Sequence, residues 1–154
     1  MSPAAADMLD PAHFANVLKP PLEAESLPAW CDTDPDFHRL EIERLFMKVW
    51  NFVGRDDLVP NPGDYLATDV AGIPIIVIRD KDGAARAFAN SCRHRGTQLL
   101  TGEGNCKAIV CPYHGWTYDI NGTCLETPGE PTNSRLKATV FQGAYPIRDY
   151  HGLL

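Results

Sequence analysis

The sequence predicts a mainly β protein: a small antiparallel β domain preceded by an N-terminal arm and one helix. Its 154 residues suffice for one domain and a short arm. Beyond Trp50, apolar residues alternate with polar ones or form short runs, as they do in strands. Two hairpin-turn pairs, Asp82-Gly83 and Asn121-Gly122, separate such runs. Short strands joined by tight turns indicate an antiparallel sheet.

Residues 1–32 are the predicted arm, because they are rich in alanine and proline and keep no regular period. Residues 33–50 are predicted to be a helix that packs on the domain. Thr33 or Asp34 can cap this helix, and Pro35 suits its first turn, where an N–H would be unpaired. An apolar stripe follows the helical spacing: Phe37, Leu40, Leu45, Phe46 and Val49. We expect four aromatic residues in the core: Trp30, Phe46, Trp50 and Phe52.

Residues 51–154 are predicted to form the β domain. Strands are expected at five places: Asp64–Val70, Ile73–Arg79, Ala85–Ala89, Ala108–Val110 and residues 116–120. Pro74 should lie at the start of its strand or at a sheet edge, because proline cannot donate a ladder hydrogen bond. The segment Gly102-Glu103-Gly104 is expected to be a loop. An apolar run begins at the last residues, Leu153-Leu154, which favours a domain truncated at its C-terminal end.

Composition and charge argue against several classes of protein. Hydrophobic residues make up 44% of the chain and charged residues 22%, a globular balance. The formal net charge of −6 disfavours a nucleic-acid partner, whose phosphates attract basic proteins. There is no apolar run near the ~18 residues of a membrane span, and no basic segment of a secretory signal at the N-terminus. We therefore expect a cytoplasmic protein with no nucleic-acid and no membrane partner.

Two short segments carry the residues best suited to chemistry, residues 92–96 (CRHRG) and 111–116 (CPYHGW). Each offers one thiolate and one imidazole on a turn, and Gly96 and Gly115 let the backbone curl around an ion. The candidate ligands are Cys92, His94, Cys111 and His114. One tetrahedral zinc ion could use all four. The mixed order C-x-H and C-x-x-H instead suits a two-iron cluster, with both cysteines on one iron and both histidines on the other.

Three further cysteines are expected to be spare thiols: Cys31, Cys106 and Cys124. A rival zinc set that includes Cys106 and Cys111 is the alternative for that part of the chain.

The two segments resemble the cluster loops in the N-terminal Rieske [2Fe–2S] domain of ring-hydroxylating (Rieske non-haem iron) oxygenase α subunits. The resemblance runs from about Trp30 to the last residue, with supporting matches at Gly63-Asp64-Tyr65, Arg79-Asp80, Asp82-Gly83 and Asn90-Ser91. It implies a small antiparallel Rieske-type β domain whose cluster loops meet at one tip. It also implies that Cys92 and Cys111 bind the inner iron, while His94 and His114 bind the outer iron. Four residues would surround the cluster: Arg93, Arg95, Trp116 and Tyr118.

The same resemblance implies electron transfer as the function. The domain would accept single electrons from a ferredoxin or a flavin reductase. It would pass them to a mononuclear Fe(II) site in the catalytic domain of the same or a neighbouring subunit. Such a site uses two histidines and one carboxylate, and His13, His38 and His151 form no such set with nearby acids, so the chain alone is expected to hydroxylate nothing. The alternatives are a freestanding Rieske ferredoxin-like carrier and a zinc-binding structural module.

Respiratory-chain Rieske proteins also resemble this chain, but they carry an extra cysteine in each loop, where Thr97 and Tyr113 stand here. They also place a serine hydroxyl near a cluster sulfide, at the position of Trp116. Tyr118 is the hydroxyl of this kind that remains. Because fewer hydrogen bonds to sulfur stabilise the reduced cluster less, we expect a potential near the low end of the Rieske range, roughly −150 mV.

Overall fold

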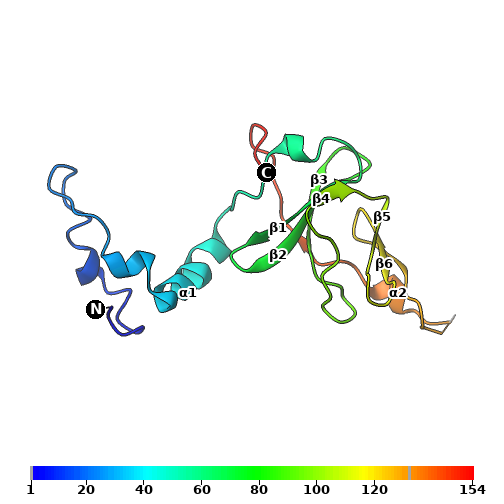
Figure 1. Cartoon of the computed structure of the whole chain (residues 1–154), viewed down its shortest axis with the longest axis horizontal. Helices are drawn as coiled ribbons and strands as arrows, with labels where there is room; N and C mark the ends of the chain where they lie inside the picture. Colours follow the sequence, from blue (N-terminus) through cyan, green and yellow to red (C-terminus); the bar gives the residue numbers. More distant parts are fainter. Residues whose placement is uncertain (1, 132) are drawn as a thin grey trace. The chain divides into compact units, whose positions relative to one another are not determined.

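A computed structural model describes residues 2–131 and 133–154. The chain divides into two compact units, Met1–Trp50 and Asn51–Leu154 (Figure 1). Among the described residues, none of the helices combines the length and the apolar character needed to cross a lipid bilayer.

The first unit consists of short helical turns around one α-helix. Its elements are η1 (Pro11–Phe14), η2 (Ala29–Asp32), α1 (Pro35–Arg44) and η3 (Phe46–Lys48). Asp34 caps α1, because its carboxylate accepts the backbone N–H of Asp36 at 2.9 Å. Pro35 occupies the first turn, as the sequence predicts. A small core joins Met8, Cys31 and Phe37, and Trp30 packs on it as expected.

Helix α1 is shorter than the predicted helix of residues 33–50, because it ends at Arg44. Two apolar side chains of the predicted stripe beyond this point stay exposed: Leu45 is 48% exposed and Val49 is 50% exposed, while Phe46 is half-buried. Since packing of an apolar face supplies most helical stability, this stretch does not continue the α-helix. The expectation that Trp50 and Phe52 are core residues is also wrong: they flank the boundary between the units and are 63% and 66% exposed.

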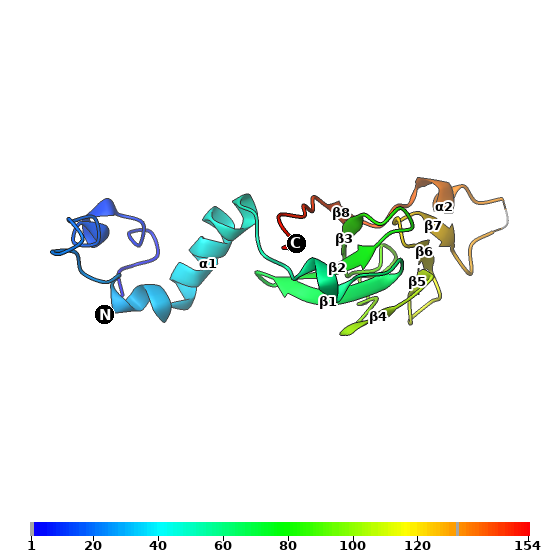
Figure 2. The ribbon, with the colours of Figure 1, turned by 90° about the horizontal axis from the view of Figure 1, so that it is seen from above.

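The second unit contains two antiparallel sheets. The larger sheet has the order β4 (Glu103–Asn105), β1 (Asp64–Val70), β2 (Ile73–Arg79), β3 (Ala85–Ala89) and β8 (Ala144–Tyr145). The smaller sheet has the order β5 (Ala108–Val110), β6 (Thr117–Asp119) and β7 (Cys124–Glu126). Two short helices complete the unit, η4 (Asp56–Leu58) and α2 (Leu136–Thr139), and α2 lies against β7 (Figure 2). The predicted bounds of β1, β2, β3 and β5 are confirmed, and β6 is one residue shorter at each end than predicted.

Strand β2 separates the two cores of this unit. Its side chains alternate, as the period of two requires: Ile76 and Ile78 enter the core that contains the cluster loops. Ile75 and Val77 enter a second core on the opposite face. Pro74 precedes the first β2–β3 pair and therefore lies at the start of its strand, as predicted. One buried strand thus supports the loops on one face and is itself packed on the other.

The expected loop Gly102-Glu103-Gly104 is instead partly a strand, β4, which pairs with β1. Gly104 stands opposite Tyr65 in this pairing. A Cβ atom on Gly104 would lie 2.9 Å from the Tyr65 hydroxyl oxygen. The glycine is therefore needed because an aromatic ring covers the strand, and it does not mark a loop.

Candidate metal centre

The first ligand-bearing loop follows β3 and is closed by its own backbone. The N–H of Cys92 donates to the carbonyl of Thr97 at 2.8 Å, and the N–H of Gly96 donates to the carbonyl of Cys92 at 2.9 Å. Gly96 has a φ of 71°, a left-handed value that glycine adopts without strain. The turn therefore holds Cys92 and His94 on one short, defined segment.

The second loop, between β5 and β6, repeats this turn. The N–H of Cys111 donates to the carbonyl of Trp116 at 2.8 Å, and the N–H of Gly115 donates to the carbonyl of Cys111 at 3.0 Å. Gly115 has a φ of 70°. The two loops thus present one cysteine and one histidine each from the same backbone shape, although their ligand spacings differ by one residue.

Both cysteines of the loops are buried, and Cys92 and Cys111 are each 3% exposed. Burial by itself raises the pKa of Cys111. The backbone N–H groups of Tyr113 and His114 and the neighbouring Cys92 thiol outweigh it, so the pKa of Cys111 lies below its usual value. A thiol that loses its proton easily is a good metal ligand.

The two histidines of the loops face each other. The ring centroids of His94 and His114 are 4.8 Å apart, and their planes make an angle of 63°. Burial lowers the pKa of His114, and electrostatic repulsion from the neighbouring His94 and Arg95 side chains lowers it further. Within the described residues, the buried Nδ1 atom of His114 has no hydrogen-bond partner. A neutral imidazole with a buried, unpaired nitrogen fits a metal ligand.

Two aromatic residues from the second loop and β6 contact the ligands. Trp116 stacks on the ring of His94 with centroids 4.7 Å apart. Tyr118 is fully buried, and its hydroxyl oxygen lies 3.5 Å from the sulfur of Cys92. The same oxygen accepts the backbone N–H of Arg93 at 3.2 Å. Burial, together with the nearby Cys92 sulfur, raises the pKa of Tyr118, so its hydroxyl keeps a proton that it can donate.

The structure thus places His94 beside His114 and Cys92 beside Cys111. Trp116 contacts His94 and Tyr118 contacts Cys92, while the side chains of Arg93 and Arg95 stay exposed. In the described part of the chain, no three or more His, Cys, Asp or Glu side chains are grouped so that they could hold one metal ion. A two-iron cluster differs from such a site, because each of its irons needs only two protein ligands.

Two buried amides that the sequence analysis assigned no role support the first loop. The side-chain oxygen of Asn90 accepts the N–H groups of Leu99 and Leu100 at 3.0 and 2.9 Å, across the base of the loop. Gln142 donates to the carbonyl of Ser91 at 2.9 Å. Asn90 adjoins the motif and could have been suspected, whereas no local pattern connects Gln142 with it.

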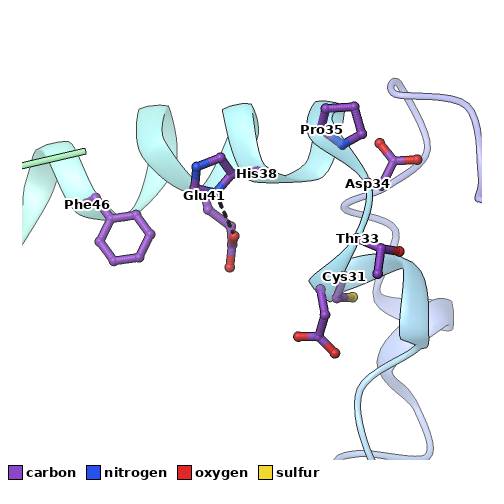
Figure 3. Close-up of a pocket in the computed structure, with 8 residues that line it drawn as sticks. Cys31, Thr33, Asp34, Pro35, His38, Glu41 and Phe46 are labelled. Carbon is purple, nitrogen blue, oxygen red and sulfur yellow. Dashed lines mark ion pairs between the residues drawn. The ribbon is translucent and has the colours of Figure 1, made fainter. Parts of the chain in front are cut away.

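A pocket of about 530 Å³ lies in the first unit and uses other residues (Figure 3). Its lining includes Cys31, Asp34 and an ion pair in which His38 Nδ1 lies 3.6 Å from a carboxylate oxygen of Glu41. None of the candidate ligands lines this pocket. All five cysteines are free of disulfides, and of the three expected to be spare thiols Cys31 and Cys124 are buried and Cys106 is half-buried.

Comparison with known proteins identifies the second unit. The family model described as the Rieske [2Fe-2S] domain matches residues 49–143. The α subunit of benzene 1,2-dioxygenase from Pseudomonas putida is 41% identical over 99 residues, which are 64% of this chain and 22% of that protein. The large oxygenase component of the naphthalene 1,2-dioxygenase system from Ralstonia sp. is 42% identical over 126 residues, 79% of this chain and 28% of that protein.

Solved structures agree with this comparison. Naphthalene 1,2-dioxygenase from Rhodococcus sp. has a TM-score of 0.75 and 34% identity, over 82% of this chain and 30% of that chain. The quaternary ammonium Rieske monooxygenase CntA in complex with L-carnitine has a TM-score of 0.77 and 32% identity, over 84% of this chain and 38% of that chain. The chain spans less than two fifths of the length of each of these relatives. With the matched region covering both ligand loops and most of the sheet that supports them, this chain belongs to the Rieske [2Fe–2S] domain family.

Proposed function

We propose that the two loops hold the [2Fe–2S] cluster, with Cys92 and Cys111 on one iron and His94 and His114 on the other. The observation that carries this proposal is the backbone turn common to both loops. That turn pairs two buried thiols with two adjacent imidazoles. Thiolates and imidazoles in this combination suit a Rieske cluster. The unpaired, buried Nδ1 of His114 supports the same assignment.

The domain that holds the cluster comprises residues 51–154 in this proposal, after the arm of residues 1–32 and the helical segment of residues 33–50. Its cysteines are free, which suits the reducing cytoplasm.

The proposed role is electron input to a ring-hydroxylating oxygenase. The domain accepts single electrons from a ferredoxin or a flavin reductase. It passes them to a mononuclear iron site in a catalytic domain of the same or a neighbouring subunit. The curated relatives named above support this role because they are oxygenase subunits of which the chain covers 22–28%. A similar solved structure, of a quaternary ammonium Rieske monooxygenase, gives insights into inter-subunit electron transfer in that protein. Hydroxylation of an aromatic ring is the reaction that the names of the dioxygenase relatives favour.

When bound, the cluster can take up and release one electron. With two thiolates and two neutral imidazoles, the oxidised centre carries no net charge and the reduced centre carries one negative charge. The exposed guanidinium groups of Arg93 and Arg95 favour the more negative state and attract an acidic partner to the loops. The hydroxyl of Tyr118 can donate a hydrogen bond to the sulfur of Cys92. Trp116 keeps the ring of His94 in one orientation.

The test is to express the chain, reconstitute it anaerobically with iron and sulfide, and measure iron, sulfide, visible absorbance and EPR. We expect about two irons and two sulfides per chain, and a red-brown colour that bleaches with dithionite. Cys92→Ser and Cys111→Ser should abolish assembly, because the iron loses a soft, charged ligand. The matched control is Cys124→Ser, a cysteine buried to a similar degree that should keep the cluster.

A colourless protein that binds one zinc ion would contradict the proposal, as would full assembly in Cys92→Ser. The electron donor is tested separately by mixing the oxidised protein with NADH alone, and then with a flavin reductase and a ferredoxin added. We expect bleaching only after the added proteins, and direct reduction by NADH would contradict the proposed partners.

A further inference from the structure

Gln142 contacts the start of the first ligand loop although it lies 51 residues further along the chain than Ser91. Its side chain is fully buried. Its amide nitrogen donates to the carbonyls of Ala89 and of Ser91, and the second bond is 2.9 Å long. Ser91 directly precedes Cys92, so this side chain holds the loop where its first ligand begins.

The backbone of the same segment contacts the support of the second loop. We call residues 141–143 the strap. The N–H of Gln142 donates to the carbonyl of Gly122 at 2.8 Å, and the carbonyl of Gly143 accepts the N–H of Ala89 at 2.7 Å. Gly122 belongs to the turn between β6 and β7, and β6 continues directly from the second loop. The strap therefore links the supports of both loops.

The side-chain oxygen of Gln142 is buried and has no hydrogen-bond partner among the described residues. A buried polar atom without a partner costs stability, so an amide at this position needs a compensating gain. Its nitrogen provides that gain, because it donates to two part-buried carbonyls, and an apolar side chain would remove both hydrogen bonds.

We propose that Gln142 is a positioning residue for the cluster: it sets where the first loop starts relative to the second. This inference rests on the proposed function, since it concerns the cluster that these loops hold. Groups that orient metal ligands tune affinity and potential without touching the metal. A shift of one loop against the other would change the separation between the ligands that the two loops provide.

The variant that tests this is Gln142→Met, which keeps a similar side-chain volume and removes both donors. The matched control is Val77→Ala in the second core, on the other face of β2, which lowers stability without contacting either loop. Cluster loss to a chelator should be at least several-fold faster in Gln142→Met. Its EPR g-values and reduction potential should differ from those of the wild-type protein. Val77→Ala, with a similar loss of thermal stability, should keep the wild-type g-values, potential and loss rate.

Wild-type g-values, potential and loss rate in Gln142→Met would overturn the inference, as would equal changes in Val77→Ala. Amide hydrogen exchange in the apo proteins provides a second readout, also for preparations that assemble no cluster. The N–H groups of Cys92 and Gly96 should exchange at least ten-fold faster in apo Gln142→Met than in apo Val77→Ala, and equal rates would overturn the inference. If the wild-type chain takes up no iron and sulfide on reconstitution, the proposed function is contradicted. The hydrogen-exchange rates of the apo proteins would still decide the role of Gln142.

Discussion

The imidazole of His94 lies flat against the indole of Trp116, with ring centroids 4.7 Å apart and an angle of 5° between the planes. The two residues come from different loops. Trp116 is 5% exposed, whereas His94 is exposed. A buried residue of the second loop therefore orients the histidine of the first loop.

Replacing Trp116 by leucine should free the ring of His94 to rotate. We expect Trp116→Leu to assemble the cluster but to release its iron to a chelator several-fold faster, with a loss of stability of about 2–4 kcal/mol. Stopped-flow absorbance with a chelator measures the release. The control is Trp30→Leu in the first unit, which should release iron at the wild-type rate. Equal release from the two variants would show that the stack has no role in holding His94.

Replacing Tyr118 by phenylalanine should lower the reduction potential. The hydroxyl of Tyr118 lies 3.5 Å from the sulfur of Cys92 and keeps its proton. A donated hydrogen bond stabilises the more negative, reduced state, so its removal should lower the reduction potential by about 50 mV. For a one-electron couple, about 59 mV corresponds to a tenfold change in the equilibrium constant. Protein-film voltammetry measures this, and Tyr65→Phe, which removes a hydroxyl packed on Gly104, should leave the potential unchanged. An unchanged or higher potential in Tyr118→Phe would argue against that hydrogen bond.

Exposed positive charge beside the loops should accelerate reduction by an acidic donor. We expect Arg93→Gln and Arg95→Gln each to slow the bimolecular reduction by a ferredoxin several-fold at low salt, and the difference to vanish at high salt. The equally exposed Arg135→Gln should react like the wild-type protein. Rates that do not change from low to high ionic strength would remove the steering role of the two arginines.

Asp80 should make the stability of the second unit depend on pH in the acidic range. It is fully buried, its carboxylate accepts the N–H groups of Asp82 and Ala84 at 2.9 and 2.8 Å, and it pairs with Arg86 at 2.8 Å. Burial raises the pKa of Asp80, but the hydrogen bonds to Arg86 and to the backbone outweigh it and lower the pKa below its usual value. The unfolded chain therefore binds more protons in acid than the folded chain does.

It follows that the contribution of Asp80 to the free energy of unfolding is fully present above its ordinary pKa of about 3.9. It is lost as the pH falls through the lower pKa of the folded state. Asp80→Asn should lower stability by about 2 kcal/mol at pH 7, and the difference from the wild-type protein should shrink toward pH 3. Urea denaturation of both apo proteins measures this, and a difference that does not depend on pH would contradict it.

Local patterns were sufficient to predict most of the sheet and the chemistry of the site. Strand β2 is apolar from Ile73 to Ile78, ends at Arg79 and is bounded by glycine-containing turns, so its ends are visible in the sequence. The ligand loops carry residue types and spacings that few structures other than a metal site would use. The prediction failed where the outcome depends on distant parts of the chain. The strand at Gly104 forms because Tyr65, far away in sequence, covers it.

The same limitation explains the failures around the boundary between the units. A helical stripe that includes Leu45 and Val49 does not reveal that about half of each side chain stays exposed. The role of Gln142 depends on carbonyls of β3 and the first loop that come within reach of its side chain only once the sheets have formed. Spacing along the chain contains no information about such partners.

The distance between Gln142 and Ser91 along the chain also has a consequence for the order of folding. The two residues are 51 positions apart, and β8 must join β3 for the strap to dock. Contacts between such remote segments form late, because closing a long loop costs entropy before any contact repays it. A growing chain that has not yet added Gln142 already contains all four candidate ligands, but the strap does not yet link the supports of the two loops. Iron and sulfide should therefore enter a site whose shape is completed by a segment that is synthesised later, and until then the thiols of Cys92 and Cys111 are open to oxidation.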